Sequence, residues 1–269
     1  MNQFHRIRIA AHMGTHSGNI PGNTWEAFEV ALRQGADIVE LDVTKSADDQ
    51  LFVFHPGTER RCFGQDLHLE QMHSDEVRKL RFLNEFDEFT SLHPLLLSDA
   101  LAMLKDRCVV NLDKFQNNPA LIARTVRSLG MQDQVIVKTA PRPELFDAVA
   151  EAAWDLPYMP VVRENDTCCE MLAARKDLRY FGVEAVFSSD DSMLASDEYI
   201  QKIHGLGKQV WLNSIRYDDR QPLAGTHCDD LALVDDPDAH WGWMGRKGYD
   251  IIQTDWVLPL YLYLRSEGW

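Results

Sequence analysis

The chain has 269 residues, 45% of them hydrophobic, which is enough for one large domain or two small ones with a packed core. Its 42 acidic residues outnumber its 27 basic ones and give a formal net charge of −15, which argues against nucleic acid as a partner, because polyanions normally meet a basic face. An anionic small substrate remains open, but it would need a local cation.

Apolar runs of strand length alternate with amphipathic helical patterns along the chain. The strand-like runs cover residues 7–12, 36–43, 51–55, 108–114, 134–139, 158–163, 183–189, 209–214 and 250–255. Such alternation implies parallel strands covered by helices. If 51–55 belongs to the same excursion as 36–43, eight strand–helix units remain, which predicts a (β/α)8 TIM barrel spanning residues 1–269 as a single domain. A doubly wound open sheet is the alternative, but the sequence has no GxGxxG turn.

Between the strands, residues 24–35 show the helical pattern most clearly. Asn23 and Glu26 form an asparagine version of a capping box, and Gly35 supplies the stop. Residues 56–98 interrupt the alternation of strands and helices. They are polar and helical without a core strand, which predicts a small helical insert after the second strand. A second excursion, 217–243, is acidic, and we expect it on the solvated surface.

Two carboxylates stand on the second predicted strand, ADIVELDV. Because side chains alternate along a strand, Glu40 and Asp42 share one face, while the other face is entirely apolar. The apolar face suits the helix layer, so the carboxylates should point into the barrel, at the end where barrel enzymes carry their chemistry. Two anions so close need a cation between them. A hard divalent ion is one solution and a core Lys or Arg is the alternative.

Histidines end the strand-like runs on either side of this pair. His12 ends the first run and His55 ends the run after the carboxylates. A single histidine at a strand end is often only a structural hydrogen-bonding residue. Two of them bracketing a carboxylate pair indicate a general acid and a general base beside a metal ion.

These segments resemble the glycerophosphodiester phosphodiesterases, which are related to phosphatidylinositol phospholipase C and to spider-venom phospholipase D. The family pattern reads HRG, PENT, AFxxAxxGAD, ExD and HD, and the matching stretches are AHMG, IPGNTWEAFEVALRQGADIVELDV and LFVFH, in that order. VVNLDK is similar to the family's third metal-ligand strand, and GYDIIQTDWVLPLYLYL to its closing strand and helix. The resemblance covers nearly the whole chain. It implies a (β/α)8 barrel that cleaves phosphodiesters with one divalent ion, Mg²⁺ or Ca²⁺.

Carried over by position, the resemblance implies that Glu40, Asp42 and Asp113 bind the metal and that His12 and His55 form the acid–base pair. The implied reaction is hydrolysis of a phosphodiester, most simply a glycerophosphodiester to an alcohol and glycerol phosphate. A hydroxyl next to the ester would attack phosphorus, and the resulting cyclic phosphate would then be hydrolysed. Two alternatives stay open. One is a lyase that stops at the cyclic phosphate, as the venom toxins do; the other is a barrel that binds phosphodiesters without turnover.

The chain departs from the family pattern at three motif positions, which in relatives are an arginine that contacts phosphate, a glutamate near the metal and the aspartate after the second histidine. Met13 replaces the arginine of HRG, as in the venom toxins, Gly22 the glutamate of PENT and Pro56 the aspartate of HD. Where the family has acid-x-Lys, Lys114 directly follows the acid, so alternation would point it away from the cavity unless the strand ends there. We therefore interpret Lys138, on the next strand, as the phosphate-binding cation. A surface position is the alternative.

Trp211 is the candidate for contact with the alcohol part of the substrate. It shares a face of the run 209–214 with Asn213, and we expect its ring at the cavity mouth; packing against the helix layer is the alternative. Asp255, after the last strand, is expected to cap the helix that follows.

The sequence also bears on location and partners. No run approaches the roughly 18 apolar residues of a membrane span, and the start, MNQFHRIRIAAH, lacks the hydrophobic segment of a signal peptide. Five scattered cysteines fit neither a disulfide framework nor a CxxC metal pattern. We expect a cytoplasmic protein with a small phosphodiester substrate, no nucleic-acid partner and no integral membrane segment. The sequence does not reveal an oligomeric state.

Overall fold

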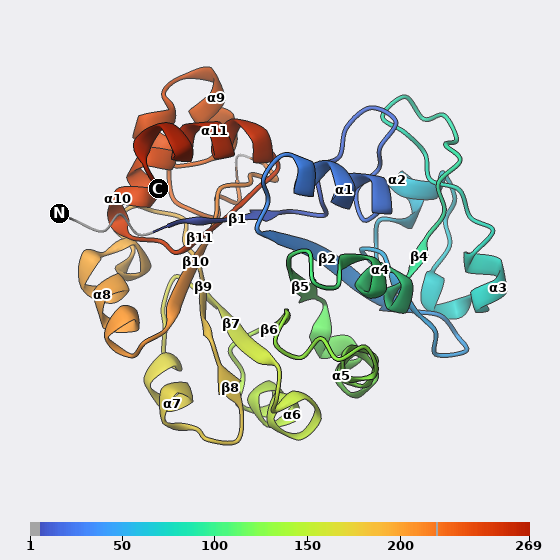
Figure 1. The fold of residues 1–269 in the computed structure, drawn as a ribbon, viewed down its shortest axis with the longest axis horizontal. Helices are drawn as coiled ribbons and strands as arrows, with labels where there is room; N and C mark the ends of the chain where they lie inside the picture. Colours follow the sequence, from blue (N-terminus) through green and yellow to red (C-terminus); the bar gives the residue numbers. More distant parts are fainter. Residues whose placement is uncertain (1–5, 219) are drawn as a thin grey trace.

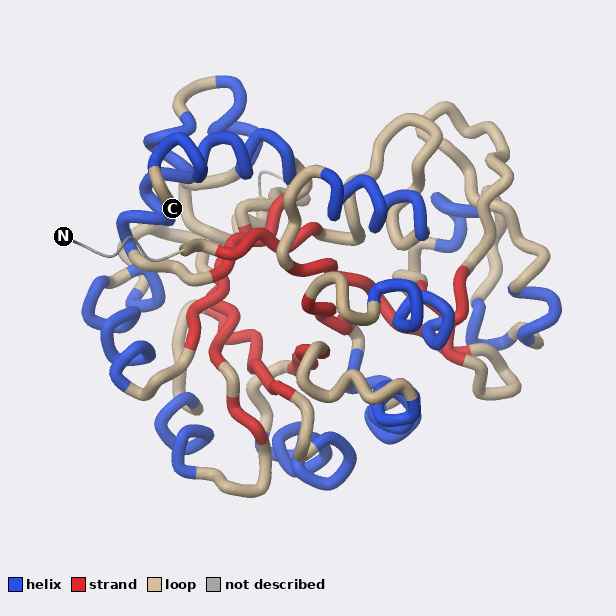
Figure 2. Tube along the Cα trace, viewed as in Figure 1, coloured by secondary structure: helices blue, strands red, loops and turns tan. Residues whose placement is uncertain are grey.

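A closed barrel of parallel strands forms the centre of the protein. The computed structural model describes residues 6–218 and 220–269, and within them eight parallel strands pair in a ring in which the first strand meets both the second and the last. Figure 2 shows this ring of strands surrounded by helices. The barrel strands, in chain order, are β1 (Arg8–Ala11), β2 (Ile38–Lys45), β5 (Val109–Asp113), β6 (Val135–Thr139), β7 (Pro157–Arg163), β9 (Gly182–Val186), β10 (Gln209–Asn213) and β11 (Ile251–Thr254). The predicted (β/α)8 barrel is confirmed.

Helices cover the outside of the ring (Figure 1). They are α1 (Trp25–Arg33), α4 (Leu97–Leu104), α5 (Pro119–Ser128), α6 (Pro143–Ala153), α7 (Cys169–Ala174), α8 (Asp197–Gly205), α9 (Asp229–Val234), α10 (Trp243–Lys247) and α11 (Val257–Glu267). Most of the longer ones bury an apolar stripe against the strands; in α1 that stripe is Ala27, Phe28 and Ala31. None of the helices in the described chain is both long and apolar enough to cross a membrane.

The helix α1 begins one residue later than the sequence suggests. Thr24 is the N-cap, and its Oγ1 accepts a hydrogen bond from the Ala27 amide at 3.3 Å. The predicted cap, Asn23, instead adopts a left-handed backbone conformation (φ 60°) and turns its side chain toward β2. Gly35 does end the helix, with φ of 101°, a value that disfavours any residue with a Cβ.

The two faces of β2 divide as alternation predicts. Val39, Leu41 and Val43 belong to the large core between the barrel and its helices. Glu40 and Asp42 point inward and line a cavity. The period-two pattern predicted the two faces of β2 correctly because one face of a barrel strand must pack against the helices.

Residues 46–96 extend from the barrel beside α1 (Figure 1). The segment contains β3 (Leu51–Val53), α2 (Glu59–Phe63), α3 (Ser74–Val77) and β4 (Leu95–Leu96). β3 pairs antiparallel with the end of β2, and β4 with β3. The segment has an apolar cluster of its own, in which the rings of Phe54 and Phe63 stack at 5.1 Å. The insert after the second strand therefore contains short helices and a small antiparallel sheet at its base, while most of its residues lie in loops and turns. The expectation of a helical insert holds only in part.

Inside the barrel, below the cavity, lies a separate apolar layer. It consists of Ala10, Ile38, Ile136, Met159, Trp211 and Ile251, one residue from each of six barrel strands. Trp211 is fully buried in this layer. The expectation that it stands at the cavity mouth was wrong, and so was the alternative that it faces the helix layer. The alternation of side chains along a strand predicts that Trp211 faces the barrel interior, but it does not predict how deep along the barrel axis the side chain lies.

Candidate active site

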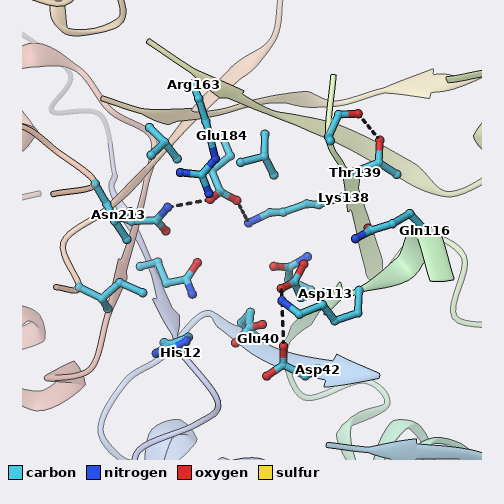
Figure 3. A pocket seen from close by; sticks show the side chains of 18 of the residues that line it. His12, Glu40, Asp42, Asp113, Gln116, Lys138, Thr139, Arg163, Glu184 and Asn213 are labelled. Carbon is cyan, nitrogen blue, oxygen red and sulfur yellow. Dashed lines mark hydrogen bonds and ion pairs between the residues drawn. The ribbon is translucent and has the colours of Figure 1, made fainter. Parts of the chain in front are cut away.

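A cavity of about 510 Å³ opens at the carboxyl ends of the barrel strands. Its walls carry most of the predicted site residues: His12, His55, Glu40, Asp42, Asp113 and Lys138. Trp211 is absent from the lining. Figure 3 shows Glu40, Asp42 and His12 on one side of the cavity, and Arg163 and Glu184 on the opposite side.

Three carboxylates meet on the first side. One oxygen each from Glu40, Asp42 and Asp113 lie within 4.8 Å of one another. The register of the sheet explains why, since Asp42 on β2 is directly paired with Asp113 on β5. Burial, followed by the charge of Asp42, raises the pKa of Glu40 to about 8. Three carboxylates this close together, two of them buried, are stable only beside positive charge or with a proton retained.

Hydrogen bonds from the first loop hold two of these carboxylates. The Met13 amide donates to Glu40 Oε2 at 2.9 Å. Asn23 Nδ2 donates to Asp42 Oδ2 at 2.9 Å, and Asn23 Oδ1 accepts from the Asp42 amide at 3.1 Å. Asn23 thus fixes both the backbone and the carboxylate of Asp42, which is why it is not available to cap α1.

The donor set fits a hard divalent cation. Carboxylate oxygens are the ligands that Mg²⁺ and Ca²⁺ prefer. Asn111, paired in register with Glu40, adds a buried carboxamide oxygen, Oδ1, that has no hydrogen-bond partner in the described chain. A buried acceptor without a donor is unfavourable unless a cation or another donor approaches it. The acidic cluster could therefore bind a metal ion.

Lys114 turns into this cluster although it directly follows Asp113. The strand β5 ends at Asp113, and Lys114 has a left-handed backbone conformation (φ 60°) that reverses the alternation. Its Nζ lies 2.5 Å from Asp113 Oδ2 and 3.6 Å from Asp42 Oδ1. The sequence allowed Lys114 to reach the cavity only if the strand ended at Asp113, and in the structure the strand does end there. Lys114 is a cavity cation, and it supplies in part the Lys–carboxylate pairing that was the alternative to a metal.

His12 is a buried histidine with a carboxylate partner. Its Nδ1 donates to Asp255 Oδ1 at 2.9 Å, which leaves Nε2 3.5 Å from the Tyr217 hydroxyl. Burial lowers the pKa of His12, but the hydrogen bond to Asp255 and the charges of Glu40 and Asp42 outweigh it and raise the pKa to about 9. The imidazolium form is therefore favoured at neutral pH.

His55 has the opposite surroundings. It is half-exposed, and its Nδ1 donates to the Pro56 carbonyl oxygen at 2.9 Å. A carbonyl can only accept, so Nδ1 carries a proton, and this tautomer has its lone pair at Nε2. That atom lies 3.9 Å from Asp42 Oδ1. The two histidines thus line one cavity in different hydrogen-bonding states.

Lys138 is neither at the surface nor free. It is 3% exposed, its Nζ lies 2.7 Å from Glu184 Oε2, and it sits over the Trp211 ring at 3.2 Å from the ring centre. Asn213 Nδ2 donates to the other Glu184 oxygen at 2.7 Å. The ammonium is therefore held on the cavity floor by an ion pair and a cation–π contact.

Sequence reasoning missed the role of Asp255. The carboxylate does not cap α11, for which Trp256 is the N-cap residue, but orients His12. Its position is fixed from behind by the buried Asp229, whose Oδ2 accepts from the Asp255 amide at 3.0 Å and from the Thr254 hydroxyl at 2.8 Å. Asp229 belongs to the excursion expected on the surface, so that expectation was wrong at this residue. The contact between His12 and Asp255 joins the two ends of the chain, and no local pattern signals it.

Comparison with known proteins bears on these features. Residues 158–264 match the family DUF4996, described as a domain of unknown function. An uncharacterized protein of Bacillus subtilis, YqiK, is 27% identical over 210 residues, covering 77% of this chain and 76% of YqiK. A glycerophosphodiester phosphodiesterase of Bacillus altitudinis is 31% identical over 129 residues, which cover 48% of this chain and 50% of that protein. The chain thus matches only about half of the length of this named relative.

Solved structures match over almost the whole chain. A glycerophosphoryl diester phosphodiesterase from Parabacteroides distasonis superposes with a TM-score of 0.80 at 16% identity, covering 99% of this chain and 89% of that one. A phosphodiesterase from Oleispira antarctica, solved in complex with the product sn-glycerol-3-phosphate, has a TM-score of 0.70 at 15% identity and covers 96% of each chain. The resemblance to the glycerophosphodiester phosphodiesterase family is confirmed. At these identities the structural matches establish the shared fold, and the named glycerophosphodiester phosphodiesterase matches this chain in sequence over about half of its length.

Proposed function

We propose that this chain is a metal-dependent phosphoric diester hydrolase that converts a glycerophosphodiester to an alcohol and glycerol phosphate. The observation that carries the proposal is the cavity itself, in which two histidines in different hydrogen-bonding states flank a cluster of three carboxylates, two of them buried. The names of the relatives and of the structural neighbours support the same reaction.

Glu40, Asp42 and Asp113 would hold one divalent ion, Mg²⁺ or Ca²⁺. Such an ion would neutralise charge on the phosphate oxygens. Lys114 and Lys138 face the same cavity, and their ammonium groups would stabilise the more anionic transition state. They are the chain's own replacements for the arginine that Met13 displaces.

The two histidines would move the protons. A substrate hydroxyl next to the ester attacks phosphorus, its oxygen forms the new P–O bond, and His55 Nε2 accepts its proton. The P–O bond to the departing alcohol breaks, and His12 donates a proton from Nε2 to that oxygen. Asp255 favours the charged form of His12 that this step needs. In a second step the roles reverse and water opens the cyclic phosphate.

The test is an activity panel followed by phosphorus NMR. The full chain is incubated with glycerophosphodiesters and with Mg²⁺ or Ca²⁺, and the products are compared with those in the presence of a chelator. Hydrolysis predicts glycerol phosphate as the final product, whereas accumulation of the cyclic phosphate would support the lyase alternative. His12→Ala and His55→Ala should each reduce the rate by roughly 10²–10⁴-fold while metal binding persists. Full activity of both variants would refute the proposal.

We further propose a setting for this activity. Residues 1–269 would act as a single domain, with 56–98 as an insert beside the cavity mouth. The five cysteines, all free thiols, support a reducing compartment and therefore the cytoplasm.

A further inference from the structure

The half of the cavity opposite the carboxylates has an apolar wall that cleavage of a polar glycerophosphodiester does not require. Val161, Val186, Ile215 and Leu223 form a cluster separate from the other cores, and all of them line the cavity. Val161 belongs to β7 and Val186 to β9, while Ile215 and Leu223 lie in the loop that follows β10. A wall of this kind contacts carbon, not phosphate or hydroxyl groups.

The loop that carries Leu223 is held in place. The Phe187 amide donates to the Leu223 carbonyl at 3.1 Å, and the Gly225 amide donates back to Phe187 at 2.9 Å. Asp190 accepts from both the amide and the hydroxyl of Thr226, at 2.9 and 2.6 Å. The apolar wall is therefore built before any ligand arrives, which reduces the entropy lost on binding.

Beside this wall stands a cation without a partner. Arg163 ends β7, lines the cavity and is exposed, and no ion pair to its guanidinium occurs in the part of the chain that the structure describes. The cavity's two lysines differ from it, because Lys114 pairs with Asp113 and Lys138 with Glu184. Figure 3 shows Arg163 across the cavity from Asp42. In a chain of net charge −15, an unpaired arginine on a cavity wall is a candidate anion-binding group.

We propose that this half of the cavity is a subsite for an alcohol with an apolar body and an anionic end. The body would lie against Val186, Ile215 and Leu223, and a carboxylate or second phosphate would pair with Arg163. The subsite takes the alcohol that does not supply the attacking hydroxyl. This inference rests on the proposed phosphodiesterase activity and names the class of its substrate. The volume of about 510 Å³ agrees with it, since pockets of this size suit ligands much larger than glycerol phosphate.

A panel of four glycerophosphodiesters separates the two features. The departing alcohol is glycerol (neither feature), benzyl alcohol (apolar ring), 4-hydroxybutyrate (carboxylate) or 4-(hydroxymethyl)benzoate (both). We expect kcat/KM to be highest for the last compound, with each feature adding about threefold to tenfold. A fifth compound, in which a phosphomonoester replaces the carboxylate of the last alcohol, then shows whether the subsite prefers a carboxylate or a phosphate.

Two variants assign the features to their residues. Arg163→Gln should abolish the advantage of the carboxylate and keep that of the ring, while Val186→Thr, which adds a hydroxyl at similar volume, should reduce the advantage of the ring. Arg124→Gln, at an exposed arginine of α5 on the outside of the barrel, is the matched control and should leave all four rates unchanged.

Each outcome decides something. If wild type cleaves all four compounds with equal kcat/KM, the subsite is refuted and the phosphodiesterase proposal survives. If it cleaves none of them with either metal, the phosphodiesterase proposal fails and the subsite with it. If Arg163→Gln slows all four compounds equally, Arg163 serves the phosphate that is cleaved, and the subsite is again refuted.

Discussion

Replacement of Asp255 by asparagine tests the coupling between His12 and the carboxylate that orients it. Asparagine keeps an oxygen that can accept the hydrogen bond from His12 Nδ1, now at 2.9 Å, but removes the negative charge. Asp255 is the largest cause that raises the pKa of His12, which burial alone would lower. The substitution should therefore lower this pKa while changing the packing very little.

The expected change in the free energy of unfolding follows from the pKa shift of His12. A pKa raised from 6.5 to about 9 corresponds to about 3 kcal/mol in favour of the charged form. Because the folded-state pKa lies above the unfolded value, this stabilisation is fully present below pH 6.5 and is lost as the pH rises through about 9. Asp255 shares the effect with Glu40 and Asp42, so we expect Asp255→Asn to lower the free energy of unfolding by about 1–2 kcal/mol at pH 6 and by much less at pH 10.

Two assays follow this change. Chemical denaturation in the presence of a chelator, at several pH values, measures the stability difference, and the pH profile of kcat/KM with metal should show an alkaline limb moved to lower pH by about one unit. Asp133→Asn is the control, since that carboxylate is 90% exposed and its ion-pair partner among the described residues is Arg179, on the barrel exterior. An unchanged alkaline limb, together with a stability difference that does not depend on pH, would refute the coupling.

Further substitutions test the cation sites. Asp42→Asn or Asp113→Asn should weaken Mg²⁺ or Ca²⁺ binding, measured by calorimetry, by about tenfold or more, and unchanged affinity would place the ion elsewhere. Lys114→Ala should reduce turnover by on the order of 10²-fold, as loss of one group that stabilises transition-state charge typically does, with folding checked by thermal denaturation. Lys138→Ala should destabilise the fold by about 3–5 kcal/mol as well as slow turnover, because it leaves Glu184 buried without its partner. The double variant Lys138→Met with Glu184→Gln should recover much of the stability but not the rate; recovery of both would limit Lys138 to a structural role.

The sequence predicts the barrel and the inward carboxylates because both rest on short-range periodicity. Alternation along β2 decides which side chains meet the helices, and parallel pairing then brings Asp113 beside Asp42. Depth along the barrel axis depends on the tilt and stagger of all the strands together, which no single strand encodes. That is why Trp211 was assigned to the correct strand face and to the wrong level.

The remaining differences come from backbone conformation and from long-range contacts. Lys114 enters the cavity only because a non-glycine residue adopts a positive φ, which local sequence seldom reveals. Asp255 follows a strand and precedes a helix, so a cap was the natural local interpretation, whereas its actual partner is 243 residues away. Local preference and tertiary contact compete at such positions, and at Asp255 the tertiary contact decides the outcome.

The departures from the family pattern form a connected set in the structure. Met13 brings no charge to the phosphate, but its amide still holds Glu40, so the exchange of side chain leaves the carboxylate cluster in place. Under the proposed function, the missing positive charge would have two replacements within the same cavity, Lys114 through a strand that ends early and Lys138 through the next strand. Both of these cations are already paired with carboxylates, so they would offer little to a second anion on the substrate. Arg163 also lines the cavity and has no ion pair within the described residues, so the carboxylate-bearing substrates would test its proposed role directly.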